Sequence, residues 1–137
     1  MNSVGFDHKI NTLRGGTVVR VWEGAYYHVA LMGDRIMHGE RSVLSFAAQA
    51  GGFIEQPYSV FAHGREVTVE GYLGNLAPRL VMRRAREARS KSYSWAHFNC
   101  EHFVRYAHGV PIESPQVRQW AALGCLVAFI ALAAARA

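Results

Sequence analysis

A cysteine, Cys100, lies in the segment HFNCEHFVRYAHG (97–109), whose residue types mark a short helix. Asn99 is a common N-cap, Glu101 falls in the first turn, and Gly109 is a typical helix stop. A cysteine at the first helical position meets the positive end of the helix dipole and unpaired backbone N–H groups, which favour thiolate over thiol. The same N–H groups can stabilise the oxyanion formed when a thiolate attacks an ester, thioester or amide carbonyl. This placement suits a nucleophile at Cys100, with a buried filler residue and a metal ligand as the alternatives.

A cysteine nucleophile needs a base, which is usually histidine. The chain contains seven histidines: His8, His28, His38, His63, His97, His102 and His108. His102 lies two residues after Cys100, about 200° around the helix, so its ring is poorly placed to reach the thiol. His108 falls in the last turn, where a cation at the negative end of the helix dipole is a sufficient explanation. We therefore expect structural roles for both.

His28 and His38 are better candidates, because each would lie on one arm of a hairpin that turns at Gly33–Asp34. A two-residue turn would point the two rings to opposite faces of the sheet. A three-residue loop that includes Arg35 would place both rings on one face, about 7–8 Å apart along the diagonal. From the residues alone, core and surface roles for this pair stay open beside a catalytic role.

Metal binding is the other use of cysteine and histidine. The chain has no C-x-x-C or H-E-x-x-H motif, and its second cysteine, Cys125, lies inside an apolar run. Two cysteines placed in this way also provide no disulfide framework, which favours a reducing compartment. We expect neither a metal nor a cofactor.

The elements that position these residues are expected to form one α+β domain, since 137 residues are enough for a single core. Short β-branched and aromatic runs predict strands at 16–24, 25–32, 35–40 and once or twice within 57–73. Residues 42–56 have no clean period and are predicted to include a loop. A basic amphipathic helix is predicted at 76–91, its arginines forming a solvated face or, alternatively, a headgroup-binding surface. The sheet should have four to six strands.

The composition changes near the C-terminus, where residues 120–135 carry no charge. A helix of this length spans about 24 Å against a hydrocarbon core of about 30 Å, and Arg118 and Trp120 at its start favour a membrane anchor. The alternatives are a helix that packs on the domain and a helix that lies in the membrane interface. The predicted division is an N-terminal segment (1–14), a catalytic domain (15–118) and a C-terminal anchor (119–137).

The cysteine segment resembles a known signature. NCEHFV, at 99–104, is similar to the motif of the lecithin retinol acyltransferase family, especially its small phospholipase A/acyltransferase members, the H-Ras-like suppressor proteins. The similarity includes Ser114, QVR at 116–118, and upstream GGTVVRVW at 15–22 and HVALMGDRIMH at 28–38. Residues from 42 to 75 lie outside the resemblance.

The resemblance implies a circularly permuted papain-like α+β fold, in which an antiparallel sheet packs against the cysteine-bearing helix. It implies Cys100 as nucleophile, His28 as general base and acid, and His38 as the residue that orients His28, in a hairpin two residues shorter than in those members. The implied activity is that of a phospholipase A1/A2 or an N-/O-acyltransferase. A membrane phospholipid would acylate Cys100, and water, an amine or an alcohol would accept the acyl group.

The partners expected from this resemblance are an acyl lipid and a membrane, with no nucleic acid, because the aromatic residues do not interleave with the basic helix. We expect a monomer whose catalytic domain is cytosolic, since the N-terminus has no apolar stretch long enough for a signal-peptide core. The alternatives are a cysteine amidase or peptidase of the same superfamily and a non-catalytic membrane-associated binding module.

Overall fold

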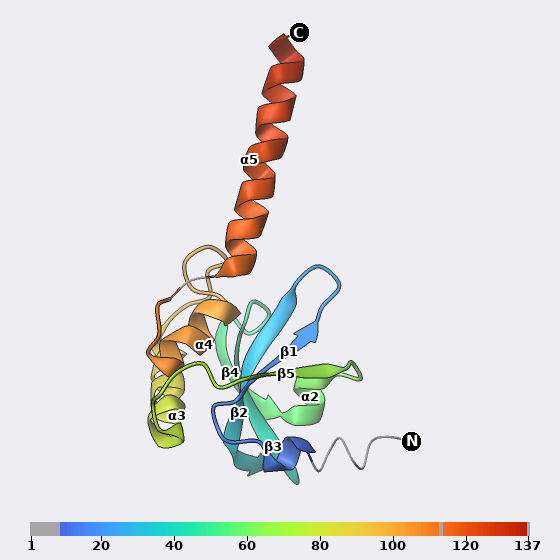
Figure 1. Ribbon diagram of the computed structural model, residues 1–137. Coiled ribbons are helices and arrows are strands. Elements are labelled where there is room, and N and C mark those ends of the chain that lie inside the picture. Colours follow the sequence, from blue (N-terminus) through green and yellow to red (C-terminus); the bar gives the residue numbers. More distant parts are fainter. Residues whose placement is uncertain (1–8, 113, 137) are drawn as a thin grey trace.

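The computed structural model describes residues 9–112 and 114–136, and it has an α+β fold with one long C-terminal helix (Figure 1). A five-stranded antiparallel sheet has the strand order β4-β3-β2-β1-β5. The strands are β1 (Val18–Trp22), β2 (Tyr27–Met37), β3 (Glu40–Ala47), β4 (Gly52–Pro57) and β5 (Val67–Gly71). The helices are α2 (Tyr58–Ala62), α3 (Pro78–Glu87), the 3-10 turn η1 (Ala88–Ser90), α4 (Cys100–His108) and α5 (Pro115–Arg136). The α+β class and the expected number of strands are confirmed.

Helices cover both faces of the sheet: α3 and α4 lie on one face, and α2 lies on the other (Figure 1). Leu31 of β2 packs on the first face in one core with Phe103 of α4. Its neighbours Ala30 and Met32 pack on the second face in one core with Phe61 of α2. Each such large buried side chain contributes about 1.5–3 kcal/mol by leaving water. These two cores therefore determine which face each residue of β2 occupies.

The prediction of a hairpin turn at Gly33–Asp34 is wrong. The second strand runs on to Met37, and the chain turns at His38–Gly39, where both residues have positive φ. Gly33 lies where a bulge interrupts the pairing of β2 with β3. A Cβ atom at Gly33 would lie 2.0 Å from the Oγ of Ser42. Glycine is required here by the close approach of β3, and the Gly-Asp pair marks a bulge instead of a turn.

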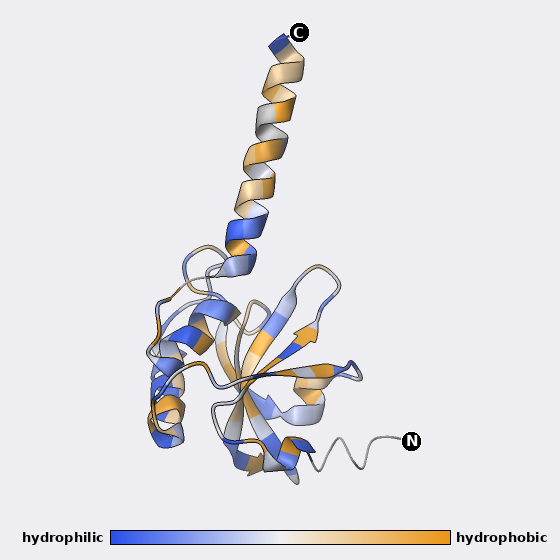
Figure 2. Ribbon diagram, in the orientation of Figure 1, coloured by the Kyte–Doolittle hydropathy of each residue, from blue (hydrophilic) through white to orange (hydrophobic). Residues whose placement is uncertain are grey.

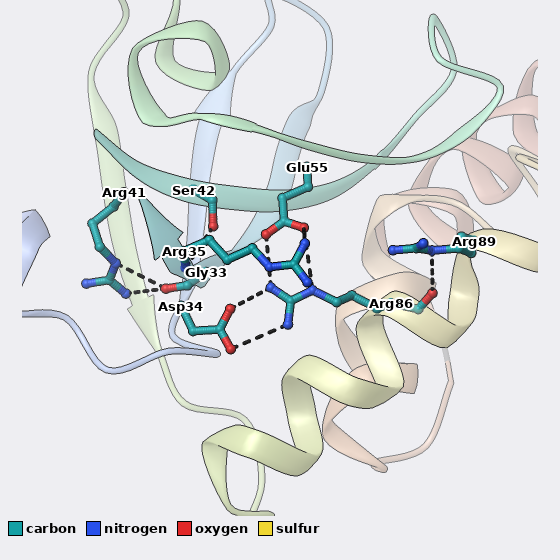
Figure 3. Close-up of polar contacts among 8 residues, drawn as sticks. All are labelled: Gly33, Asp34, Arg35, Arg41, Ser42, Glu55, Arg86 and Arg89. Carbon is teal, nitrogen blue, oxygen red and sulfur yellow. Dashed lines mark hydrogen bonds and ion pairs between the residues drawn. The ribbon is translucent and has the colours of Figure 1, made fainter. Parts of the chain in front are cut away.

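The predicted basic helix is present as α3 and η1, but not all of its arginines are solvated side chains. Arg86, whose side chain is 18% exposed, pairs with Asp34 of β2 and, at 2.9 Å, with Glu55 of β4 (Figure 3). The hydrogen bond from Arg86 holds the pKa of Asp34 below its usual value. The solvated-face interpretation is therefore wrong for Arg86, which connects α3 to two strands.

Two regions contain different elements from those predicted. Residues 42–56 form most of β3 and β4 around a turn at 48–51. Ser42–Phe46 is buried at every position, and a strand buried on both faces shows no alternation of polar and apolar residues. Within 57–73 the helix α2 precedes a single strand, β5.

The C-terminal helix projects away from the sheet, and its outer part is largely apolar (Figure 2). It has 22 residues, and at 1.5 Å per residue it is about 33 Å long, enough for a hydrocarbon core of about 30 Å. The described side chains from Ala121 onward are exposed, so this part does not pack on the domain. One helix is therefore long and apolar enough to span a membrane. It begins at Pro115, earlier than the predicted anchor.

Candidate active site

Cys100 is the first residue of α4, as predicted, and Asn99 is the N-cap. The side chain of Asn99 accepts hydrogen bonds from the backbone N–H groups of Glu101, at 2.9 Å, and His102, at 3.2 Å. The His102 ring completes a capping box, because its Nδ1 accepts from the backbone N–H of Asn99 at 3.0 Å. The structural role expected for His102 is therefore confirmed.

The sulfur of Cys100 lies against the backbone of β2. Its S–H donates to the carbonyl oxygen of Tyr27 at 3.9 Å, and the backbone N–H of Val29 is hydrogen bonded to the sulfur. These two groups flank His28 in the chain. The cysteine-bearing helix and the histidine strand are thus in contact.

The ionisation of Cys100 differs from the sequence-based prediction. Burial raises the pKa of the thiol to about 11, since the residue is only 5% exposed. Hydrogen bonds from backbone N–H groups oppose this shift, including those of Cys100 and Glu101 in the first turn of α4. The N–H groups at the helix N-terminus favour the thiolate as predicted, but desolvation is the larger influence and the net shift is toward the protonated thiol.

His28 does not contact the thiol. Its ring centroid lies 5.5 Å from that of Phe61, on the face of the sheet covered by α2. Val29, the next residue, packs on the opposite face in the core that contains Cys100. The ring borders a cavity of about 510 Å³ that Glu23 and His63 also line, and burial lowers its pKa. The contact predicted between Cys100 and His28 is therefore not formed in this structure.

His38 is also separate from the other predicted site residues. It is exposed, has φ of 51°, and forms the turn between β2 and β3. Ten residues separate it from His28, which at about 3.3 Å per residue is on the order of 30 Å along an extended strand. Because the hairpin turns at His38–Gly39, the two rings do not share a face across it. This geometry does not support the predicted orienting role of His38.

The remaining described histidines have other environments. Nε2 of His63 lies 3.0 Å from Oε1 of Glu23, and His97 is exposed. His108 is buried, with Nε2 at 2.7 Å from the carbonyl oxygen of Gly16, and burial lowers its pKa. Its structural role is confirmed, but a neutral buried ring replaces the predicted cation at the helix end. His8 lies outside the described residues.

A second cavity, of about 510 Å³, opens beside Cys100. Most of its wall is apolar or aromatic, with Tyr26, Tyr93, Trp95 and Trp120 as the large side chains. The pKa values of both tyrosines are raised, mainly by burial and partly by the nearby Cys100. No histidine lines this cavity among the described residues. Its size and apolar wall suit a ligand with a hydrocarbon portion.

The first turn of α5 is bonded to this site. Oε1 of Gln116 accepts from the backbone N–H of Tyr27 at 2.8 Å, and its Nε2 donates to the Tyr27 carbonyl at 2.9 Å. That carbonyl also accepts from the Cys100 thiol. Ser114 donates to the Glu101 carboxylate and accepts from Asn99 at 3.3 Å. The start of the apolar helix is thereby held against both α4 and β2.

Sequence reasoning did not identify Gln116, Tyr26 or Tyr93 as parts of the site. A signal existed for Gln116, because the resemblance included Ser114 and QVR at 116–118. The two tyrosines reach the cavity from loops before β2 and α4, and their sequences carry no spacing that links them to Cys100.

Comparison with known proteins identifies no family model and no curated sequence that matches this chain. Within 9–112 and 114–136, no three His, Cys, Asp or Glu side chains are grouped so that they could hold a metal ion. The case for a function therefore rests on the NCEHFV motif and on the geometry around it.

Proposed function

We propose that this protein is a thiol-dependent lipid acyl hydrolase or acyltransferase, similar to the lecithin retinol acyltransferase family, with Cys100 as its nucleophile. One observation carries the proposal: Cys100 begins α4 beside an apolar cavity whose wall includes the first turns of a membrane-length helix. A permuted papain-like relationship belongs to the same proposal, and the order of the histidine strand and the cysteine helix supports it.

In the proposed reaction, Sγ of Cys100 attacks the carbonyl carbon of a glycerophospholipid ester. The backbone N–H of Cys100 stabilises the oxyanion, because those of Glu101 and His102 donate to the side chain of Asn99. The oxyanion then collapses to an acyl-thioester and a lysolipid. The base takes the thiol proton and returns it to the departing alkoxide. Attack by water on the thioester releases a fatty acid, and attack by an amine or alcohol transfers the acyl group.

His28 is proposed as the base, which requires its ring to turn to the Cys100 side of β2. A shift of one residue, or a bulge, reverses the face of a strand residue. Such a change can be local, because Tyr27 to Val29 pair with β1 whereas pairing with β3 begins at Ala30. The loop at 23–26 can take up the displaced residue. Pairing with His28 would also lower the pKa of the thiol, as ionisation requires.

The proposed location is a membrane, with α5 as a single-pass anchor and the catalytic domain in the cytosol. The exposed, apolar side chains of α5 support the anchor. Trp120 of α5 lines the cavity beside Cys100, so anchoring through α5 would hold that cavity at the bilayer. Tethering at this surface raises the effective concentration of lipid substrate.

The test uses the full chain in vesicles that contain acyl-labelled phosphatidylcholine, with and without phosphatidylethanolamine. We expect free fatty acid, lysolipid or N-acyl product, loss of all product in Cys100→Ser, and an acyl group trapped on Cys100 by mass spectrometry. The matched control is Cys125→Ser, because Cys125 is exposed on α5 and should leave product formation unchanged. Product that persists in Cys100→Ser would exclude Cys100 as the nucleophile.

A non-catalytic membrane-associated binding module is the second candidate. It is favoured by the separation of His28 from Cys100 and by the raised pKa of the thiol. Lipid binding without any Cys100-dependent product in the same assay would select it. A cysteine amidase or peptidase is less well supported, because the apolar cavity beside α5 suits a lipid better than a polar peptide.

A further inference from the structure

Four large aromatic side chains are exposed around the base of α5. Trp22, Tyr27, Trp95 and Trp120 have 46%, 36%, 52% and 48% of their surface exposed. They belong to β1, the start of β2, the loop before α4, and α5. We call these four residues the aromatic rim.

Contacts place the members of the aromatic rim together. The rings of Trp22 and Tyr27 have centroids 4.8 Å apart, and the backbone of Tyr27 is hydrogen bonded to Gln116 of α5. Trp95 and Trp120 line the same cavity beside Cys100. Figure 1 shows the same arrangement in the ribbon: the β1–β2 connection and the loop before α4 both lie at the end of the domain from which α5 departs.

We propose that the aromatic rim is a membrane-contacting surface that inserts into the bilayer interface around the entry point of α5. This inference rests on the proposed membrane anchoring by α5, and it adds a second contact between the domain and the lipid. Tryptophan and tyrosine favour the headgroup region, where the ring is in an apolar environment and its polar atom meets water. The surface is continuous with α5, whose Trp120 is both a rim residue and part of the anchor helix.

Charged groups beside the rings fit the same partner. The guanidinium of Arg20 lies 4.2 Å from the centre of the Tyr27 ring and is ion-paired with Glu70 at 3.0 Å. Arg65 donates to the main-chain oxygen of Trp22 and is the second cation beside the rings. Lipid headgroups present phosphate oxygens at the depth where interfacial aromatic rings lie, which suits cations at the edge of the rim. Other exposed apolar side chains, such as Ile36 and Val60, lie on β2 beyond the bulge and on α2.

The rim has a consequence for substrate entry. Trp95 and Trp120 border the cavity that contains Cys100, so insertion of the rim would open this cavity toward lipid instead of water. An acyl chain could then pass from the bilayer to the thiol without crossing an aqueous layer. The aromatic rim therefore favours a membrane lipid as the substrate over a soluble, monomeric ester.

The test is tryptophan quenching in the full chain. Three variants each keep one of Trp22, Trp95 and Trp120 and replace the other two with Phe; a fourth replaces all three with Phe and carries Ile36→Trp. Each is reconstituted in phosphatidylcholine vesicles whose acyl chains are brominated close to the carbonyl. We expect at least twofold quenching at Trp22, Trp95 and Trp120, and none at position 36.

The outcomes separate the inference from the anchoring on which it rests. Quenching at Trp120 with none at Trp22 or Trp95 overturns the aromatic rim and leaves α5 as an anchor. No quenching at Trp120 overturns the anchoring and the rim together. If a variant fails to fold, hydroxyl-radical oxidation of the unsubstituted chain replaces it: vesicles should protect Trp22 and Trp95 at least threefold, and equal oxidation with and without vesicles overturns the inference.

Discussion

The ionisation of Cys100 makes a quantitative prediction about its reactivity. Burial raises the pKa of this thiol to about 11, at least about two units above that of an ordinary cysteine. Each pKa unit changes the thiolate fraction tenfold well below the pKa, so at neutral pH the folded chain should hold about a hundredfold less thiolate than an ordinary cysteine. Alkylation requires the thiolate. Cys100 in the folded chain should therefore react with iodoacetamide at least about a hundredfold more slowly than in the unfolded chain.

The assay follows alkylation of Cys100 by mass spectrometry in Cys125→Ser, which leaves one thiol. The same variant unfolded in guanidinium chloride is the reference, since the thiol and its neighbours in sequence are identical. The rate in the folded chain should rise about tenfold per pH unit up to about pH 10, whereas that of the unfolded chain should level off near the ordinary thiol pKa of about 8.5. A folded rate within about tenfold of the reference at neutral pH would refute a protonated, buried thiol.

The same measurement tests whether His28 turns toward Cys100 when lipid binds. Addition of phosphatidylcholine vesicles should accelerate alkylation at neutral pH, because an adjacent imidazole would favour the thiolate. The variant His28→Ala should lose this acceleration. The matched variant His63→Ala should keep it, because that ring pairs with Glu23 beside α2. Acceleration that survives in His28→Ala would contradict His28 as the base.

Three further predictions concern stability. Gln116→Ala removes two hydrogen bonds to the β2 backbone and should lower the free energy of unfolding by about 1–2 kcal/mol in urea titrations. The control Gln119→Ala lies on the exposed face of α5 and should have no effect. Gly33→Ala places a Cβ 2.0 Å from a side-chain oxygen of β3 and should cost about 1–3 kcal/mol in the same titration. Gly124→Ala, whose Cβ would meet no group outside its own stretch of helix within 4 Å, should be neutral or stabilising. Because burial lowers the pKa of His108 in the folded chain, the unfolded chain binds more protons below about pH 6.5, so stability should fall as pH decreases from there toward the folded pKa. Melting temperatures at neutral and acidic pH check this, and a pH dependence unchanged in His108→Asn would contradict it.

Most of the site's local features could be predicted because they depend on residues close in sequence. Asn99 caps α4 through the N–H groups of Glu101 and His102, and Gly109 ends the helix with a positive φ. The apolar helix α5 could be predicted from composition alone, because residues 120–135 carry no charge. These features need no partner from elsewhere in the chain, so capping and hydrophobicity rules identify them.

The tertiary structure decided which groups surround the thiol. The face of His28 depends on the register of β1 with β2 and on two cores that fix Ala30 and Leu31, and this register cannot be read from the strand itself. Gly33 looked like a turn residue, but its role comes from the approach of β3, a segment that pairs with β2 only after folding. The sequence by itself determined that Cys100 begins a helix and that an apolar helix ends the chain. Packing determined that the thiol is protonated and that its nearest cavity is walled by aromatic residues, because desolvation and strand register are properties of the assembled layers.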